Sequence, residues 1–267
     1  MNLALLVHTW RANRLRLAVV TVALTFWGSL MPIIFDAFGE QFQDIMDSGA
    51  FPNQFMEFGG GDIFSLTGSV ALGFVHPIAV GLNLVFAAGF AATAVAGERQ
   101  RGTLEVLLSR PLSRRVIHAT LGFAGAAFIA ITVAGLTFGA WLGSAITGRT
   151  PELGVSNLPL LWLNVTLLYW ALGSIALLAS VSFDRVSPAV SLTLAVVLVS
   201  YFLDVLGSLW PDAKGLQPFS VFHYVDPKSV LAGFPDRGDF ALLAVVTAAA
   251  VLAALFIFPR RDLAAPS

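Results

Sequence analysis

Residues 116–146 read VIHATLGFAGAAFIAITVAGLTFGAWLGSAI, a run that contains no Asp, Glu, Lys or Arg. A helix needs roughly 20 mostly apolar residues to cross the hydrocarbon core of a bilayer. Backbone groups in lipid must be hydrogen-bonded internally, and a continuous apolar run achieves this as a helix. A strand of a transmembrane barrel would be shorter and would alternate polar with apolar residues. This stretch therefore predicts a membrane-spanning helix.

Similar apolar runs occur five more times along the chain. The six predicted spans cover residues 17–35, 70–96, 116–146, 158–181, 186–209 and 240–258. Composition agrees, because 57% of the residues are hydrophobic and only 12% are charged, whereas soluble domains carry roughly a quarter charged residues. Cysteine is absent, which excludes disulfides and thiolate metal sites. We predict an all-α polytopic membrane protein with one transmembrane domain over residues 1–267.

The basic residues are sorted between the two sets of loops that six spans create. Eleven of them fall in one set and four in the other. The first set consists of Arg11, Arg14, Arg16, Arg99, Arg101, Arg110, Arg114, Arg115, Arg185, Arg260 and Arg261, and the second of Arg149, Lys214, Lys228 and Arg237. Loops rich in Lys and Arg stay in the cytoplasm. We therefore expect both termini to be cytoplasmic in a plasma or inner membrane.

Two features outside the spans indicate further helices. Residues 1–16 place Leu3, Val7 and Trp10 on one helical face and Asn2 and Asn13 on the other. This pattern predicts an amphipathic helix that lies on the inner membrane surface. The loops over residues 39–68 and 210–239 carry many aromatic residues, which suits short helices packed against the outer end of the bundle.

Three glycines of the third span, Gly135, Gly139 and Gly143, recur at intervals of four. They share one helix face and let another backbone approach closely. This pattern predicts helix packing, and the neighbour is either another helix of the same chain or a second copy.

Polar residues within the spans are few, and each has two interpretations. His76, Asn83 and Asn164 are candidates for lining a translocation path, because polar groups at membrane depth are costly and often functional. The alternative favoured for His76 is a hydrogen-bonded histidine beside a kink at Pro77, and for the two asparagines it is hydrogen bonding between helices.

No catalytic or metal motif is present in the sequence. Neither Lys214 nor Lys228 follows the glycine pattern of a phosphate-binding Walker A loop, so ATP binding by that route is excluded. The four histidines are scattered, and His-Glu-x-x-His and Gly-x-Ser-x-Gly are both absent. We expect no catalytic residues, no metal site, no cofactor on this chain and no nucleic-acid partner.

The loop over residues 97–115 reads GERQRGTLEVLLSRPLSRR and connects the second and third spans. Thr103 can cap a short helix, and Pro111 stops its continuation. Leu104, Leu107 and Leu108 would give that helix an apolar face beside charged residues. Such a helix suits docking to another protein, whereas the simpler alternative is a basic loop anchored at lipid headgroups.

The stretch from Glu98 to Arg114 resembles the intracellular loop of type-2 ABC transporter permeases, in which Gly-Thr-Leu-Glu, two leucines and a Pro-Leu-Ser-Arg tail recur. The ending Phe258-Pro-Arg-Arg-Asp-Leu263 is also similar to that family. The resemblance implies six spans, an N-terminal elbow helix and a short coupling helix in the loop. It assigns to ATPase coupling the residues Glu98, Gly102, Thr103, Leu104, Glu105, Leu107 and Leu108.

The resemblance also implies partners and a function. Two separate ATPase subunits would bind ATP and Mg, and a second permease copy or a paralogue would complete an exporter. Two other functions stay open. A membrane-embedded enzyme would need ionisable groups converging at one depth, for which His76 and Asp204 are the nearest candidates. A non-transporting membrane scaffold or assembly factor would use the same fold.

Overall fold

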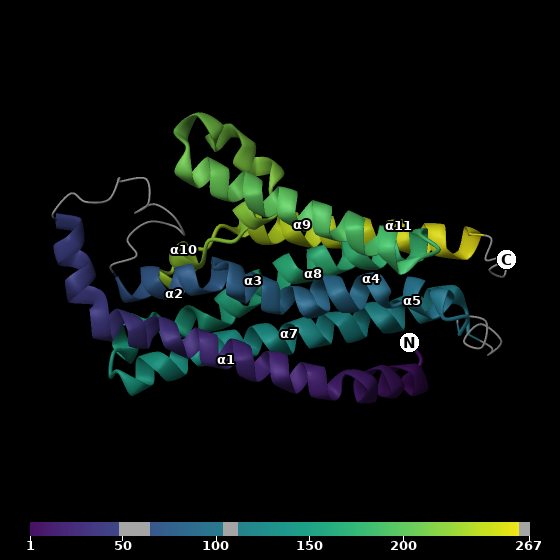
Figure 1. Cartoon of the computed structure of the whole chain (residues 1–267), viewed down its shortest axis with the longest axis horizontal. Helices are drawn as coiled ribbons and strands as arrows, with labels where there is room; N and C mark the ends of the chain where they lie inside the picture. Colours follow the sequence, from purple (N-terminus) through teal and green to yellow (C-terminus); the bar gives the residue numbers. More distant parts are fainter. Residues whose placement is uncertain (48–64, 104–111, 262–267) are drawn as a thin grey trace.

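The computed structural model describes residues 1–47, 65–103 and 112–261, and all regular secondary structure in these residues is helical. Five long helices lie side by side along one axis (Figure 1). They are α1 (Leu3–Asp47), α7 (Arg114–Ile146), α8 (Leu158–Ser182), α9 (Val186–Leu209) and α11 (Arg237–Arg260). Each contains a stretch long and apolar enough to cross a bilayer. The prediction of an all-α polytopic membrane protein is confirmed.

The second span is broken rather than straight. Its parts are α2 (Leu66–Val75), α3 (Pro77–Leu84), the π-helical segment η2 (Val85–Phe90), α4 (Ala91–Thr93) and α5 (Ala96–Gln100). The chain bends by 42° at His76, because a proline lacks an N–H and disfavours helical geometry in the residue before it. The His76 Nδ1 atom accepts a hydrogen bond from the Ile78 N–H at 3.2 Å and caps the next helix. Counted as one span, this bent pair brings the described total to six.

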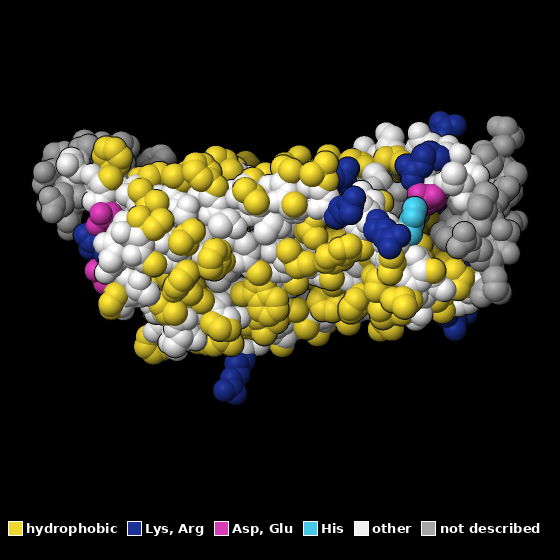
Figure 2. Space-filling view, turned by 90° about the horizontal axis from the view of Figure 1, so that it is seen from below, with side chains coloured by type: hydrophobic (Ala, Val, Ile, Leu, Met, Phe, Trp, Pro, Cys, Tyr) yellow, Lys and Arg dark blue, Asp and Glu magenta, His cyan; other side chains and the backbone are white. Residues whose placement is uncertain are grey.

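The start of α1 and the end of α11 lie at the same end of the bundle (Figure 1), as an even number of spans requires. We call this the basic end, because Arg99, Arg101, Arg114 and Arg261 lie there. Figure 2 shows most of the Lys and Arg side chains of one face gathered toward this end, while hydrophobic side chains cover much of the middle. The middle of the bundle therefore presents an apolar surface suited to lipid.

The first helix differs from its predicted form. Residues 1–16 are helical, as expected for the elbow, but they continue without a break into the first span as part of α1. The reason is local, since no Gly or Pro interrupts the sequence between Leu3 and Trp27. Pro32 lies inside the helix, and the last turns of α1 are angled away from the bundle axis (Figure 1).

The glycine face of α7 packs against α1 of the same chain, which settles the identity of its neighbour. A Cβ atom added at Gly139 would lie 2.2 Å from the carbonyl oxygen of Thr25, and one added at Gly143 would lie 2.3 Å from that of Ser29. These distances are far below van der Waals contact, so the two backbones touch directly. Small residues on α7 therefore fix the position of α1.

Short helices cover the opposite end of the bundle, as predicted for residues 210–239. They are η5 (Pro211–Phe219), η6 (Phe222–Tyr224) and α10 (Pro227–Leu231), and the turn between α7 and α8 adds η3 (Thr150–Glu152) and η4 (Val155–Asn157). The other outer loop falls mostly in residues 48–64, which lie outside the described residues.

Candidate functional site

The segment that leads into the predicted coupling loop ends in a fixed turn. Helix α5 stops at Arg101, and Gly102 follows with a φ of +70°, in the left-handed region. The Thr103 N–H donates to the Glu98 carbonyl at 2.9 Å, and the Gly102 N–H donates to the Arg99 carbonyl at 3.0 Å. These two bonds form a Schellman motif, which ends a helix with a glycine because other residues resist a positive φ.

The Glu98 side chain reinforces the same turn. Its carboxylate accepts a hydrogen bond from the Thr103 hydroxyl at 2.5 Å and pairs with the Arg101 guanidinium. The structure therefore brings together three residues predicted for coupling, Glu98, Gly102 and Thr103. The other four, Leu104, Glu105, Leu107 and Leu108, lie outside the described residues, as does the helix that Thr103 was expected to cap.

Hydrogen bonds connect this turn to the fourth and fifth spans. The Ser180 hydroxyl of α8 accepts from the N–H groups of Val95 and Ala96, both at 3.0 Å, where the second span is irregular. The Gln100 side chain accepts from the Val186 N–H, the first residue of α9, at 3.0 Å. A displacement of α5 would therefore act directly on the basic ends of α8 and α9.

An ionic network links the same region to the last span. Arg99 of α5 pairs at 2.5 Å with Asp184, in the turn between α8 and α9, and Arg261 pairs with the same carboxylate. Arg261 also donates to the Val181 carbonyl at 2.9 Å, and its own carbonyl accepts from Arg114 of α7 at 2.6 Å. The pKa of Arg261 is lowered from its ordinary value, because the effect of partial burial exceeds the opposing effect of Asp184. The guanidinium nevertheless stays charged at neutral pH.

Sequence reasoning missed Asp184. A usable signal was present, because Asp184 is an acidic residue in a three-residue turn between two spans, in a set of loops dominated by arginine. An acid in that position must face several arginines once the span ends converge. What the sequence leaves open is which arginines they are.

A cavity of about 540 Å³ separates the start of α1 from the α5 turn. The polar face of residues 1–16 points into it, so the predicted amphipathic pattern has its polar side directed inward, while Leu3 and Trp10 are exposed. Polar residues on its wall include His8, Thr9, Asn13, Glu98, Arg101 and Thr103. The cavity leaves space between the turn and the start of α1.

The three candidates for a translocation path occupy separate hydrogen-bonded positions. Asn83 is fully buried, donates to the Ala79 carbonyl at 3.0 Å and accepts from the Thr132 hydroxyl at 3.0 Å. Asn164 is also buried and donates at 3.2 Å to the Tyr224 carbonyl of the outer segment. His76 caps α3, as described above. The Asn83–Thr132 bond joins α3 to α7, and the Asn164–Tyr224 bond joins α8 to the outer segment, while the Asn164 Oδ1 atom is buried without a partner among the described residues. A place on a translocation path stays a prediction for all three residues.

Metal chemistry has no visible support in the part of the chain that the structure describes. No group of three or more His, Cys, Asp or Glu residues is placed there to hold a metal ion.

Comparison with known families supports a transporter. A family model described as ABC-2 family transporter protein matches residues 11–263, nearly the whole chain. A comparison with curated proteins gave no match.

Proposed function

The chain belongs to the ABC-2 family of transporter proteins, and from that membership we propose that it forms the translocation pathway of an ATP-driven exporter. It is a membrane permease of an ABC transporter, and the family pairs such permeases with ABC ATPase subunits. We propose two ATPase subunits, which bind ATP and Mg, together with a second permease copy or a paralogue. The sequence offers no Walker A motif of its own.

The turn from Glu98 to Thr103 carries the proposal that the 97–115 loop couples ATP hydrolysis to transport. Two backbone bonds and one carboxylate fix the direction in which the chain leaves the membrane span. A force applied to residues 104–111 by an ATPase would therefore reach α5 through a defined geometry rather than through a slack linker.

From α5 the movement would pass to the other spans through the polar contacts of the basic end. Ser180 and Gln100 connect α5 to α8 and α9, and Asp184 connects Arg99 with Arg261 at the end of α11. An ATPase changes the permease only if it contacts two permease states differently. In this proposal the contacts of Ser180, Gln100 and Asp184 convert closure of the ATPases into a rearrangement of the spans.

Orientation follows from charge. The basic end would face the cytoplasm of a plasma or inner membrane, because cytoplasmic loops retain Lys and Arg. This places the coupling turn and both termini on the side where ATP is available, and the outer segment with η5 and α10 on the far side, toward which cargo would be exported.

The test replaces Gly102 by alanine and by valine in the reconstituted permease–ATPase complex. A residue other than glycine in the left-handed region is disfavoured by roughly 1–2 kcal/mol. We therefore expect permease-dependent ATPase activity and transport to fall about fivefold to thirtyfold, with valine the more severe. An added Cβ atom meets nothing within 4 Å at Gly102, so the effect reports the turn geometry rather than a steric clash.

Gly148 provides a matched control at the opposite end of the bundle. Its φ is +74°, an added Cβ atom meets nothing within 4 Å, and the Arg149 N–H donates to the Ser144 carbonyl in the same motif. The Gly148 variants carry the same backbone strain and should keep ATPase stimulation. Equal ATPase stimulation in the Gly102 and Gly148 variants would refute the coupling role of the turn. A wild-type permease that binds the ATPases but shows no stimulated transport would favour a scaffold function.

A further inference from the structure

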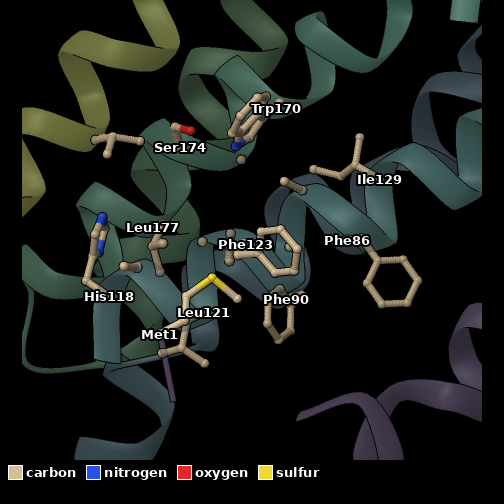
Figure 3. Close-up of a pocket in the computed structure, with 17 residues that line it drawn as sticks. Met1, Phe86, Phe90, His118, Leu121, Phe123, Ile129, Trp170, Ser174 and Leu177 are labelled. Carbon is tan, nitrogen blue, oxygen red and sulfur yellow. The ribbon is translucent and has the colours of Figure 1, made fainter. Parts of the chain in front are cut away.

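A second pocket lies within the bundle, apart from the coupling turn. It has a volume of about 280 Å³ and is lined almost entirely by apolar side chains of η2, α4, α7 and α8, with Val251 of α11 and Met1 (Figure 3). Phe123 and Trp170 at its rim are exposed, so the pocket opens on the side of the bundle. Ligand pockets of drug-sized molecules begin near 300 Å³, so this one suits a single slender chain.

An irregular helix shapes one wall of the pocket. The π-helical segment η2 carries Phe86 and Phe90, both of which line it. A π-helical turn is rare and is found frequently at functional sites, because it displaces side chains from the positions that a regular helix would give them. Here it sets two phenylalanines against α7, where they contact Phe128.

His118 is the unusual member of the lining. Its side chain is 2% exposed, and neither ring nitrogen has a hydrogen-bond partner among the described residues. Buried polar atoms are normally paired, and inside a membrane water is not at hand to replace a missing partner. The imidazole lies in the pocket wall among aliphatic and aromatic side chains (Figure 3). Both ring nitrogens are covered by neighbouring side chains, so an occupant that displaces those side chains would meet a donor and an acceptor without a partner among the described residues.

The length and depth of the pocket match one leaflet of a bilayer. On α7 its lining runs from His118 to Ile129, which at 1.5 Å per residue is about 16 Å. The hydrocarbon core is about 30 Å thick, so this is close to half of it. His118 lies one helical turn from Arg114, which begins α7 at the basic end. The imidazole would then sit just below the headgroups and Ile129 near the bilayer centre.

We propose that this pocket binds one acyl chain of a phospholipid from the leaflet at the basic end, with the His118 imidazole donating a hydrogen bond to an ester oxygen of that lipid. The apolar wall contacts the acyl chain, and the ester oxygen accepts from an imidazole that has no hydrogen-bond partner in the described part of the protein. The site belongs to a single permease chain and involves neither the coupling turn nor an ATPase.

The test uses full-length permease in vesicles of phosphatidylcholine that carry a photoreactive diazirine at the end of one acyl chain. Phe86 and Ile129 are 0% and 1% exposed, so surrounding lipid cannot reach them. Both line the pocket, and we expect both to be labelled by a chain that enters the pocket and displaces the side chains that cover them. Trp170 at the rim should be labelled in any case and reports the bulk lipid. Labelling of Trp170 without Phe86 or Ile129 in the wild type would overturn the proposal.

A matched pair of variants separates occupancy from accidental labelling. Gly122 lines the pocket, and an added Cβ atom there meets only Leu177, at 3.6 Å, so Gly122→Leu fills the space without a backbone clash. Gly81 is exposed with nothing within 4 Å of an added Cβ atom, so Gly81→Leu serves as the control. We expect Gly122→Leu to abolish labelling of Ile129 and Gly81→Leu to preserve it. Equal labelling in both variants would contradict the site.

The role of His118 is tested with two substitutions. One hydrogen bond corresponds to roughly a threefold to tenfold change in an equilibrium constant. His118→Leu should raise by that factor the lipid fraction that gives half-maximal labelling of Ile129, and His118→Gln, which restores a donor and an acceptor, should reverse most of the change. An unchanged lipid dependence in His118→Leu would remove the histidine from the site. A diazirine fatty acid that labels as well as the phospholipid would overturn the assignment to a phospholipid.

Discussion

Replacing Gly139 by alanine tests the close packing of α7 against α1. The added Cβ atom would lie 2.2 Å from the Thr25 carbonyl oxygen, whereas ordinary contact begins at 3.4 Å. The obstructing atom belongs to a helix backbone and cannot swing aside as a side chain would. The two helices must therefore separate locally by about an ångström, and a gap of that size forfeits a quarter to a half of the dispersion energy of the atoms involved.

Two opposing terms set the size of the effect. Overpacking of this kind destabilises a folded protein by about 1–3 kcal/mol, and we expect the upper part of that range because the neighbouring glycine contacts move as well. Alanine favours the helix over glycine by up to about 1 kcal/mol, which offsets part of the loss. The expected net destabilisation of Gly139→Ala is about 1–2 kcal/mol.

Thermal unfolding of the purified permease in detergent, followed by circular dichroism, measures this change. For a chain of this length 1 kcal/mol corresponds to about 2–4 °C, so the Tm of Gly139→Ala should fall by about 2–8 °C. The control is Gly81→Ala, because an added Cβ atom at Gly81 meets nothing within 4 Å, and its Tm should stay unchanged or rise. A Gly139→Ala protein that melts with the wild type would show that α1 and α7 do not pack as described.

Two further predictions concern the polar contacts. Asp184→Asn should weaken the ion pairs with Arg99 and Arg261 and reduce ATPase stimulation, while the free energy of unfolding falls by only about 1 kcal/mol because the carboxylate is more than half exposed. The difference in stability should shrink in high salt, and a difference that is independent of salt would contradict an ionic role. Asn83→Leu should lower the free energy of unfolding by about 0.6 kcal/mol, the average for a hydrogen bond between membrane helices. The loss stays this small because the Thr132 hydroxyl still has the Ile129 carbonyl, at 3.0 Å, as an acceptor. Abolished transport at unchanged stability would assign Asn83 to the translocation path instead.

Much of the fold was predictable because the membrane imposes a local rule. A segment in lipid must satisfy its own backbone bonds, so each apolar run specifies a helix without reference to the rest of the chain. The bend at His76 was readable for the same reason, since Pro77 acts on its immediate neighbours. The sequence predicted a separate amphipathic helix before the first span, whereas α1 is continuous. The change from an amphipathic to an apolar pattern at Leu17 indicates a change of environment and not a break in the backbone.

The candidate site was only half readable. Glu98, Gly102 and Thr103 lie within six residues of one another, and the resemblance to a family loop singled them out. That Gly102 and Thr103 end helix α5 in a Schellman motif emerged only from the structure. The Asp184 network and the His118 pocket join residues from different spans. Their formation depends on the rotation of each helix about its axis and on its position along the bundle. Neither quantity can be predicted from the sequence of one segment.

The sequence by itself therefore determined the helical spans and the distribution of charge between the two ends, because each rests on neighbouring residues and on the cost of polar groups in lipid. Tertiary structure alone decided that the Gly139 face packs against α1 of the same chain, that Asp184 meets Arg99 and Arg261, and that His118 has no hydrogen-bond partner among the described residues. Those contacts arise only when distant helices come together, since interactions between helices act across space and not along the chain.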